Sequence, residues 1–241
     1  MLGPKHPGVA LVYNNIAAVY GRNDEHDKAL GFYNKALDIL KERRGTDHPE
    51  VALCYDNIGR LYTKQKKYRT AIEFLEKSMT IRMKRLKPDH PDMAGSCESL
   101  AEIYAKNGNP EKALQFYNIA VSILVKNMGP DYPPIAQNLL DMGFIYKDQK
   151  NLPKAMECFE RAYKIASKSF GPDHSVSLRS KTHYWSLVQK LDPKKAVEFY
   201  EATLARAENG DADAQNDIGH SYWSGNGAPK DIREAIKWFT K

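Results

Sequence analysis

The sequence predicts an all-α solenoid, in which antiparallel helix pairs stack one after another. Apolar residues recur at offsets of three and four, the spacing that marks one face of an amphipathic helix. A polar break such as Asn23-Asp24 divides the first unit into two helices. A linker motif returns every 42 residues, and a fixed period of that size indicates a repeat array. The same linker position is occupied by His6, His48, His90, Tyr132 and His174.

Each of the first four units is expected to contain a helix A followed by a helix B. The apolar residues of helix A run from Tyr13 to Tyr20, Tyr55 to Tyr62, Cys97 to Tyr104 and Leu139 to Tyr146. Those of helix B run from Ala29 to Leu37, Ala71 to Ser78, Ala113 to Ala120 and Ala155 to Ala162. With the helices that follow these units, we expect about twelve in the chain.

Small residues recur at one position of each helix. Small side chains let two helix backbones approach toward the close end of the usual ~8–10 Å separation. A tyrosine ring three residues later in helix A fills the space beside them, so we interpret the pattern as a packing device. The small positions are Ala17, Gly59, Ala101 and Gly143 in helix A and Ala29, Ala71, Ala113 and Ala155 in helix B.

This order of small residue, Tyr, Ala, aromatic residue and Ala resembles the tetratricopeptide repeat. The long unit, the Gly-Pro-Asp-His-Pro linkers and the stretch Tyr13-Asn14-Asn15-Ile16-Ala17 are similar to the repeats of kinesin light chains. The resemblance covers about residues 1–175. It implies a right-handed superhelix of antiparallel helix pairs, with a concave groove lined mainly by helix A.

The pattern changes in the fifth unit. Its helix A, residues 176–189, carries Tyr184-Trp185 where the small residue is expected. Residues 211–239 are similar to a Sel1-like repeat, and residues 193–208 resemble the second half of another such unit. Glycines of the loop at 225–227 suit a tight turn with positive φ. The residues that carry the Sel1-like resemblance include Ile218-Gly219, Tyr222, Gly225-x-Gly227, Asp231, Ala235 and Trp238-Phe239.

Two domains are therefore predicted. Residues 1–190 hold four tetratricopeptide units and a degenerate fifth helix, and residues 191–241 hold the Sel1-like segment. Both ends of the chain look cut, since solenoids normally end in atypical capping repeats. We expect the Sel1-like segment to be truncated and the chain to belong to a longer protein.

The linker histidines are expected to begin helices rather than to bind metal. Proline is favoured in the first helical turn, and a polar residue just before it caps the helix. Two helices separate successive linkers, so at ~8–10 Å per helix the histidines lie too far apart to share one ion. Tyr132 also replaces one of them. No metal site and no cofactor is predicted.

Composition and motifs exclude several classes of protein. No run approaches the ~18–20 apolar residues of a membrane span, and the N-terminus is no signal peptide. Cys54, Cys97 and Cys158 show no Cys-x-x-Cys pairing, so we expect neither disulfides nor structural zinc, and a cytoplasmic location. Nucleotide-binding, metalloprotease and hydrolase motifs are missing, and the chain is predicted not to be an enzyme.

The resemblance also implies which residues face the groove. In kinesin light chains, groove asparagines and basic residues hold extended acidic peptides, and the corresponding residues here are Asn14, Asn15, Arg22, Asn57, Arg60 and Lys64. Arg22, Lys64 and Lys106 repeat at 42-residue spacing and would form a row of cations. The alternative is that a cation near a helix C-terminus favours the helix dipole by ~0.3–1 kcal/mol and needs no ligand. All expected groove positions are Leu11, Asn14, Ala18, Gly21, Arg22, Leu53, Asp56, Arg60, Thr63, Lys64, Gly95, Glu98, Glu102, Ala105, Lys106, Gln137, Leu140, Phe144, Lys147 and Asp148.

The predicted function is that of a protein-interaction scaffold or adaptor that binds an extended, partly acidic peptide. Residues 41–87 hold thirteen Lys/Arg and six Asp/Glu, a net charge of +7 against +6 for the whole chain. Glu98, Glu102, Asp141 and Asp148 make the groove mixed or acidic beyond the second unit. Two alternatives stay open: an interaction domain of a larger enzyme, and a basic solenoid that binds nucleic acid. Binding of nucleic acid needs exposed aromatic rings between the cations, whereas most tyrosines here are expected to pack between helices. No membrane insertion is expected.

Overall fold

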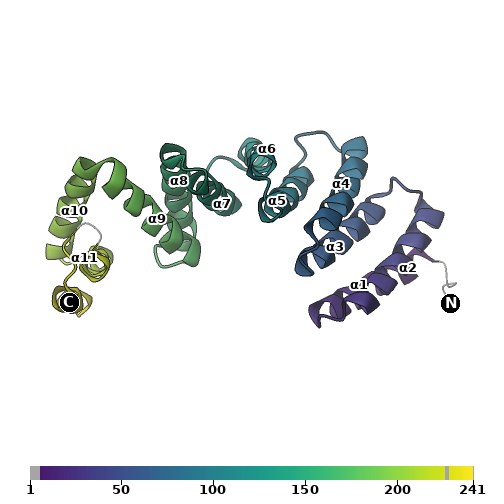
Figure 1. The fold of residues 1–241 in the computed structure, drawn as a ribbon, viewed down its shortest axis with the longest axis horizontal. Helices are drawn as coiled ribbons and strands as arrows, with labels where there is room; N and C mark the ends of the chain where they lie inside the picture. The colour runs from purple at the N-terminus through teal and green to yellow at the C-terminus, as the bar shows by residue number, and fades with distance from the viewer. Residues whose placement is uncertain (1–5, 226–227, 241) are drawn as a thin grey trace. The chain divides into compact units, whose positions relative to one another are not determined.

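The structure is a computed structural model that describes residues 6–225 and 228–240. These residues form twelve helices joined by short turns, with no strand among them (Figure 1). The helices are α1 Pro7–Arg22, α2 His26–Arg44, α3 Pro49–Lys64, α4 Tyr68–Arg85, α5 Pro91–Lys106, α6 Pro110–Met128, α7 Pro134–Asp148, α8 Leu152–Phe170, α9 Ser175–Leu191, α10 Pro193–Glu208, α11 Ala212–Ser224 and α12 Ile232–Phe239. The predicted all-α repeat class is confirmed.

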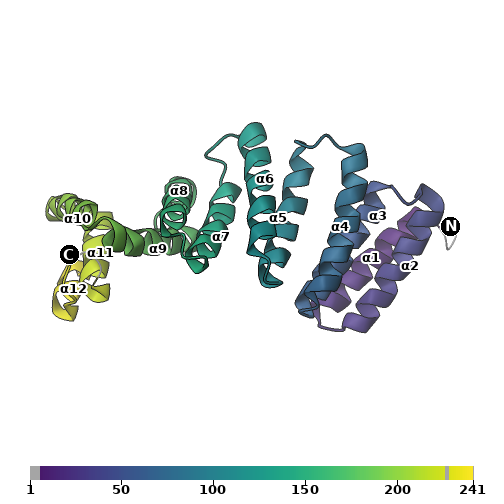
Figure 2. The same cartoon turned by 45° about the horizontal axis from the view of Figure 1, so that its top comes forward.

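The helices divide into two compact units, Met1–Pro130 (unit 1) and Asp131–Lys241 (unit 2). In unit 1, α1 pairs with α2, α3 with α4 and α5 with α6, and each pair packs on the next (Figure 2). In unit 2, α7 pairs with α8 and α11 with α12. The predicted boundary at residue 190 differs from this division after Pro130 and stays a prediction.

Each described linker histidine caps the helix that follows it. Its Nδ1 accepts a hydrogen bond from the backbone N–H two residues later, at the helix end where such groups have no partner within the helix. The predicted role of these histidines in beginning helices is confirmed. Residues 2–5 of the first linker lie outside the described residues. The bonds are His6–Gly8 at 3.0 Å, His48–Glu50 at 3.3 Å, His90–Asp92 at 3.2 Å and His174–Val176 at 3.3 Å.

In the second, third and fourth repeats, a lysine near the C-terminal end of helix B forms an ion pair with an aspartate. That aspartate lies in the linker that precedes helix A of the same repeat. Lys84 Nζ lies 2.9 Å from Asp47 Oδ2, and Lys168 Nζ lies 2.6 Å from Asp131 Oδ2. Lys126 forms the equivalent pair with Asp89. Because these pairs are exposed, each contributes at most about 1 kcal/mol to stability. They fix the linker of each repeat against its second helix.

The small residue of helix A receives a large side chain from helix B of the same repeat. A Cβ added to Gly59 would lie 2.9 Å from Leu75 Cγ, and one added to Gly143 would lie 2.5 Å from Cε1 of Phe159. Both distances are too short for carbon atoms, so the packing interpretation of these small residues is confirmed. Beside them stand three stacked ring pairs, Tyr20–Phe32 at 5.5 Å, Tyr62–Phe74 at 5.6 Å and Tyr104–Phe116 at 5.6 Å between centroids.

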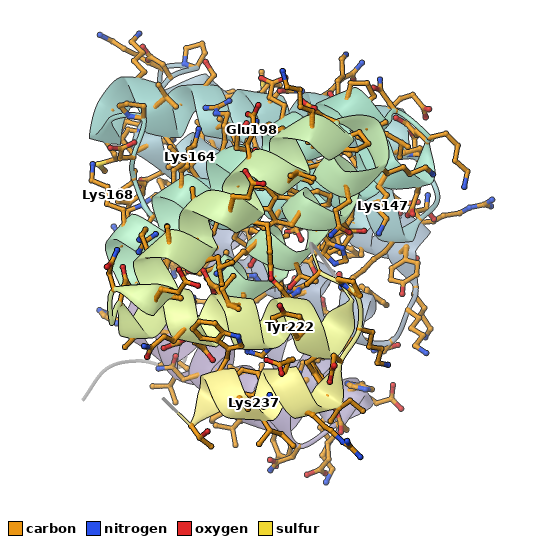
Figure 3. All side chains as sticks on the ribbon, turned by 90° about the vertical axis from the view of Figure 1, so that its left-hand side faces the viewer. Lys147, Lys164, Lys168, Glu198, Tyr222 and Lys237 are labelled. Carbon is orange, nitrogen blue, oxygen red and sulfur yellow. The ribbon has the colours of Figure 1, made fainter. Side chains whose placement is uncertain are left out.

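In α11 and α12, a side-chain cap begins the helix and a glycine again accommodates a large side chain of the neighbouring helix. Asp211 caps α11 by accepting a hydrogen bond from the N–H of Ala214 at 3.0 Å. Gly219 faces Phe239, whose Cε1 would lie 2.6 Å from an added Cβ. Gly225 ends α11 with φ of 76°, as expected for the tight turn, whereas Gly227 lies outside the described residues. Figure 3 looks onto α11 and α12, which carry Tyr222 and Lys237 and lie side by side.

Gly143→Ala is expected to lower the free energy of unfolding by about 1–3 kcal/mol, because the added methyl overlaps the fully buried Phe159 ring. Gly31→Ala is the matched control. Gly31 lies in α2 with open space where its Cβ would stand, so alanine there is expected to stabilise by up to about 1 kcal/mol. Urea unfolding of both variants checks this, and equal effects would contradict the proposed packing.

Candidate functional site

Helices α1, α3 and α5 of unit 1 bring equivalent positions onto one surface. The residues at positions 11, 53 and 95, and those at 22, 64 and 106, are exposed in all three helices. At positions 14, 56 and 98 the side chains are half-buried or buried. We call the surface formed by Asn14, Asn15, Arg22, Asn57, Arg60 and Lys64 the basic face.

Two of the predicted asparagines contact each other. Asn57 Nδ2 donates to Asn14 Oδ1 at 3.0 Å and so joins α3 to α1, and Cys54 Sγ lies 3.8 Å from the same oxygen. An amide side chain both donates and accepts, so this bond leaves a donor on Asn14 and an acceptor on Asn57. Asn15 is exposed beside them. The pair therefore presents hydrogen-bonding groups in a fixed orientation.

The three cations of the basic face lie near the C-terminal end of α1. Lys64 Nζ donates to the carbonyl oxygen of Gly21 at 3.0 Å, which places a positive charge at the negative end of that helix. Burial raises the pKa of Tyr33, and the charges of Arg60 and Arg22 act in the opposite direction. Among the described residues, neither arginine forms an ion pair or a side-chain hydrogen bond.

The third repeat, formed by α5 and α6 of unit 1, presents a different surface. Lys106 Nζ lies 2.5 Å from Glu102 Oε1, so its charge is balanced within α5. Leu11 and Leu53 are 60% and 46% exposed at equivalent positions of α1 and α3, and they give the basic face an apolar border. Among the expected groove positions of unit 1, the cations that form no ion pair with a described residue therefore lie on α1 and α3.

Three expected groove positions are buried instead of facing an open surface. Gly21 is buried, and a Cβ there would lie 3.2 Å from Leu61 Cδ1. Leu140 is 0% exposed and Asp56 only 8%. Asn14, Asp56 and Leu140 occupy equivalent positions of helix A. Side chains at that position face neighbouring helices, which explains why they are half-buried or buried. The expectation that Asp56 faces the groove was wrong.

Asp56 is part of a buried network that joins three helices of unit 1. Arg82 of α4 donates from Nη2 to Asp56 Oδ2 on α3 and from Nη1 to Ser96 Oγ on α5. Burial raises the pKa of the Asp56 carboxyl, although nearby Ser78 and the charges of Arg82 and Arg60 act in the opposite direction. The network fixes α5 against the second repeat and so sets the position of the surface next to the basic face.

The described residues offer little for catalysis or metal binding. No group of three or more His, Cys, Asp or Glu among them lies close enough to hold a metal ion. The three cysteines are free and buried on separate helices, and burial raises the pKa of each thiol to about 11. None of the helices in the described ranges is long and apolar enough to cross a membrane.

Family comparisons match most of the chain. The tetratricopeptide repeat matches residues 8–84, 92–168 and 134–209, and the Sel1 repeat matches residues 212–241. The segment 193–208, which resembles half of a Sel1-like unit, falls inside the tetratricopeptide match. No catalytic family is among these matches. No curated protein matches the sequence.

Solved structures share the fold at low sequence identity. A kinesin light chain-type protein of nearly identical TPR-like repeats from Podosopora anserina has a TM-score of 0.66 and 22% identity, over 79% of this chain and 90% of that one. BtubC (BKLC) from P. vanneervenii has a TM-score of 0.67 and 19% identity, over 76% and 73%. Aspartyl phosphate phosphatase F from Bacillus subtilis has a TM-score of 0.65 and 14% identity, over 97% and 58%. The resemblance to kinesin light chain repeats is confirmed at the level of the fold.

Arg82→Ala is expected to lower the free energy of unfolding by about 3–5 kcal/mol at pH 7, because it leaves the buried Asp56 carboxylate unpaired. A carboxyl whose pKa is raised by folding contributes less stability as the pH rises through that pKa. The loss should therefore be smaller near pH 4, about the ordinary pKa of Asp, where the carboxyl is protonated.

Lys84→Ala serves as the control in thermal unfolding at both pH values. It removes an ion pair whose side chains are 55% and 47% exposed, and it is expected to cost at most about 1 kcal/mol. A loss for Arg82→Ala that is as small as this, or that grows toward acid pH, would show that Asp56 does not need its partner.

Proposed function

The chain belongs to the tetratricopeptide repeat family, and from that premise we propose that its basic face binds an extended, partly acidic peptide. Proteins of this family generally act as protein-interaction scaffolds. The observation that carries the proposal is the set of cations Arg22, Arg60 and Lys64 on α1 and α3, none of which forms an ion pair among the described residues. The charge of Arg60 acts on the buried Asp56 carboxyl one turn away, but its exposed guanidinium forms no direct contact with that carboxylate.

Each part of the basic face suits one part of such a ligand. A guanidinium group binds carboxylates through two parallel hydrogen bonds, and Lys64 adds a point charge beside it. The Asn14–Asn57 pair and exposed Asn15 can bond the peptide backbone, which gives affinity without demanding a particular side chain. Leu11 and Leu53 add apolar contacts at the border. These features together favour an acidic peptide with apolar residues.

The polarity of unit 1 also suggests how the peptide is oriented. At the expected groove positions, the cations without an ion pair among the described residues lie on α1 and α3, whereas the third repeat has Lys106 already paired with Glu102. The acidic part of the peptide should therefore lie over the first two repeats. Lys106 is proposed as the weaker contact at the far end of the site.

We also propose that the protein binds without catalysing a reaction, needs no cofactor and resides in the cytoplasm. Its cysteines support that location, since three separate buried thiols fit a reducing compartment.

The proposal is tested by selecting peptides from a displayed library of natural sequences against the purified chain. The double variant Arg60→Glu/Lys64→Glu is expected to weaken binding of the best acidic peptide at least tenfold, as expected for reversing two charges at an interface. Isothermal titration calorimetry at fixed salt concentration measures the change, and circular dichroism confirms that the variant is folded.

The matched control is Arg43→Glu, a reversal at an exposed position of α2 that lies outside the basic face. It should leave the affinity within about twofold, because surface charges beyond a Debye length of ~10 Å are screened. Equal losses for both variants, or selection of peptides without acidic residues, would contradict the proposed site.

A further inference from the structure

The fifth repeat departs from the close packing of the other four. The positions of Leu178 and Trp185 in α9 correspond, at 42-residue spacing, to small residues in every earlier helix A. Those equivalents are Ala10, Ala52, Ala94 and Ala136 for Leu178, and Ala17, Gly59, Ala101 and Gly143 for Trp185. Two large side chains therefore stand where two small ones allow the helices of a pair to approach.

The result is an opened helix pair inside unit 2. Helix α9 packs chiefly on α8, and α10 contacts α11 more than it contacts α9. Figure 1 shows α9 and α10 diverging from the turn at Asp192. Tyr200 does not fill a hole in α9, as Phe159 does in α7, but its hydroxyl lies 3.0 Å from that of Tyr222 on α11. A cavity of about 440 Å³ lies between α9, α10 and α11.

The cavity is lined by aromatic rings. Trp185 stacks on Phe199 with ring centroids 3.7 Å apart, and Trp223 lines the same cavity while 57% exposed. The indole N–H of Trp185 is shielded from solvent, and no described residue accepts a hydrogen bond from it. The cavity therefore offers a ligand mainly the faces and edges of aromatic rings.

The rim of the cavity carries an acidic residue that has lost its partner. In the second, third and fourth repeats the linker aspartate pairs with a lysine of helix B, as Asp131 does with Lys168. Asp173 is the fifth such aspartate and lines the cavity, but the corresponding end of α10 offers Asn209-Gly210. Among the described residues Asp173 has no ion-pair partner.

The other charges at the cavity are already balanced. Lys181 pairs with Asp217, and Arg206 lies 2.5 Å from Asp211. The cavity therefore combines aromatic walls with one carboxylate that has no ion-pair partner among the described residues.

We propose that this cavity binds an aromatic side chain of an extended peptide, with a basic residue next to it. The ring stacks against the aromatic walls. The neighbouring Lys or Arg lies at Asp173, whose charge is complementary. The cavity volume falls within the ~300–1,000 Å³ range of ligand pockets, enough for one large side chain with adjoining backbone. The proposal does not depend on the basic face of unit 1.

The test uses the full chain and the capped peptide Ac-Gly-Trp-Lys-Gly-NH2, followed through the indole N–H resonances of the protein. Its three tryptophans are Trp185, Trp223 and Trp238, and the last is buried and is not among the residues that line the cavity. The resonances of Trp185 and Trp223 are expected to shift saturably, and that of Trp238 to stay in place. Ac-Gly-Ala-Lys-Gly-NH2 should bind at least tenfold more weakly. No shift at Trp185 would overturn the proposal.

Paired variants locate the site. Thr182 lines the cavity and is exposed, so Thr182→Phe fills the opening and is expected to abolish the shifts. Ser186→Phe adds the same ring at an exposed α9 position outside the lining and should leave binding unchanged. Retained binding in Thr182→Phe would place the peptide elsewhere and overturn the proposal.

Two further comparisons test the ligand chemistry. Asp173→Asn should remove the preference for Ac-Gly-Trp-Lys-Gly-NH2 over Ac-Gly-Trp-Glu-Gly-NH2, which for an exposed pair is expected to be roughly two- to fivefold. An unchanged preference would overturn the role of Asp173. Binding of N-acetyltryptophanamide as tight as that of the tetrapeptide would show that flanking backbone is not engaged, and would overturn the assignment to a peptide.

Discussion

The close approach of two helices at one small residue per repeat is the constraint on which the rest of this structure depends. At Gly59 and Gly143 the neighbouring side chains leave no room even for a methyl group. A helix pair held this closely has one rotation about each helix axis that fits. That rotation decides which positions of helix A are exposed. The surface available for binding is therefore fixed by packing several residues away from it.

One position in helix A produces two different surfaces. Where it is small, as in the first three repeats, the pair closes and successive helices A present the basic face. Where it is Trp185, the pair α9–α10 opens and leaves an aromatic cavity beside α11. Asp173 also lacks the lysine that equivalent aspartates contact, because the corresponding end of α10 carries Asn209-Gly210. Both proposed sites thus follow from how the same repeat is packed.

The sequence predicts the fold well because the repeat period is itself a packing signal. It identifies the helices, the capping histidines and the small residues, since each depends on nearby residues or on the 42-residue spacing. It misplaces Asp56, whose partners Arg82 and Ser96 lie on two other helices at a different spacing. The sequence shows that Trp185 departs from the repeat pattern, but it does not predict the cavity. The separation of α9 from α10 depends on how α9 packs on α8 and α10 packs on α11.

The central claim is that a peptide lies along α1 and α3 of unit 1, and photocrosslinking tests it most directly. Leu11, exposed at the border of the basic face, is replaced by benzoylphenylalanine, and Asn34, exposed on α2, is replaced in a parallel variant. With the best selected acidic peptide, the account predicts crosslinking from position 11 and none from position 34. Crosslinking from position 34 alone, or equally from both, would contradict it.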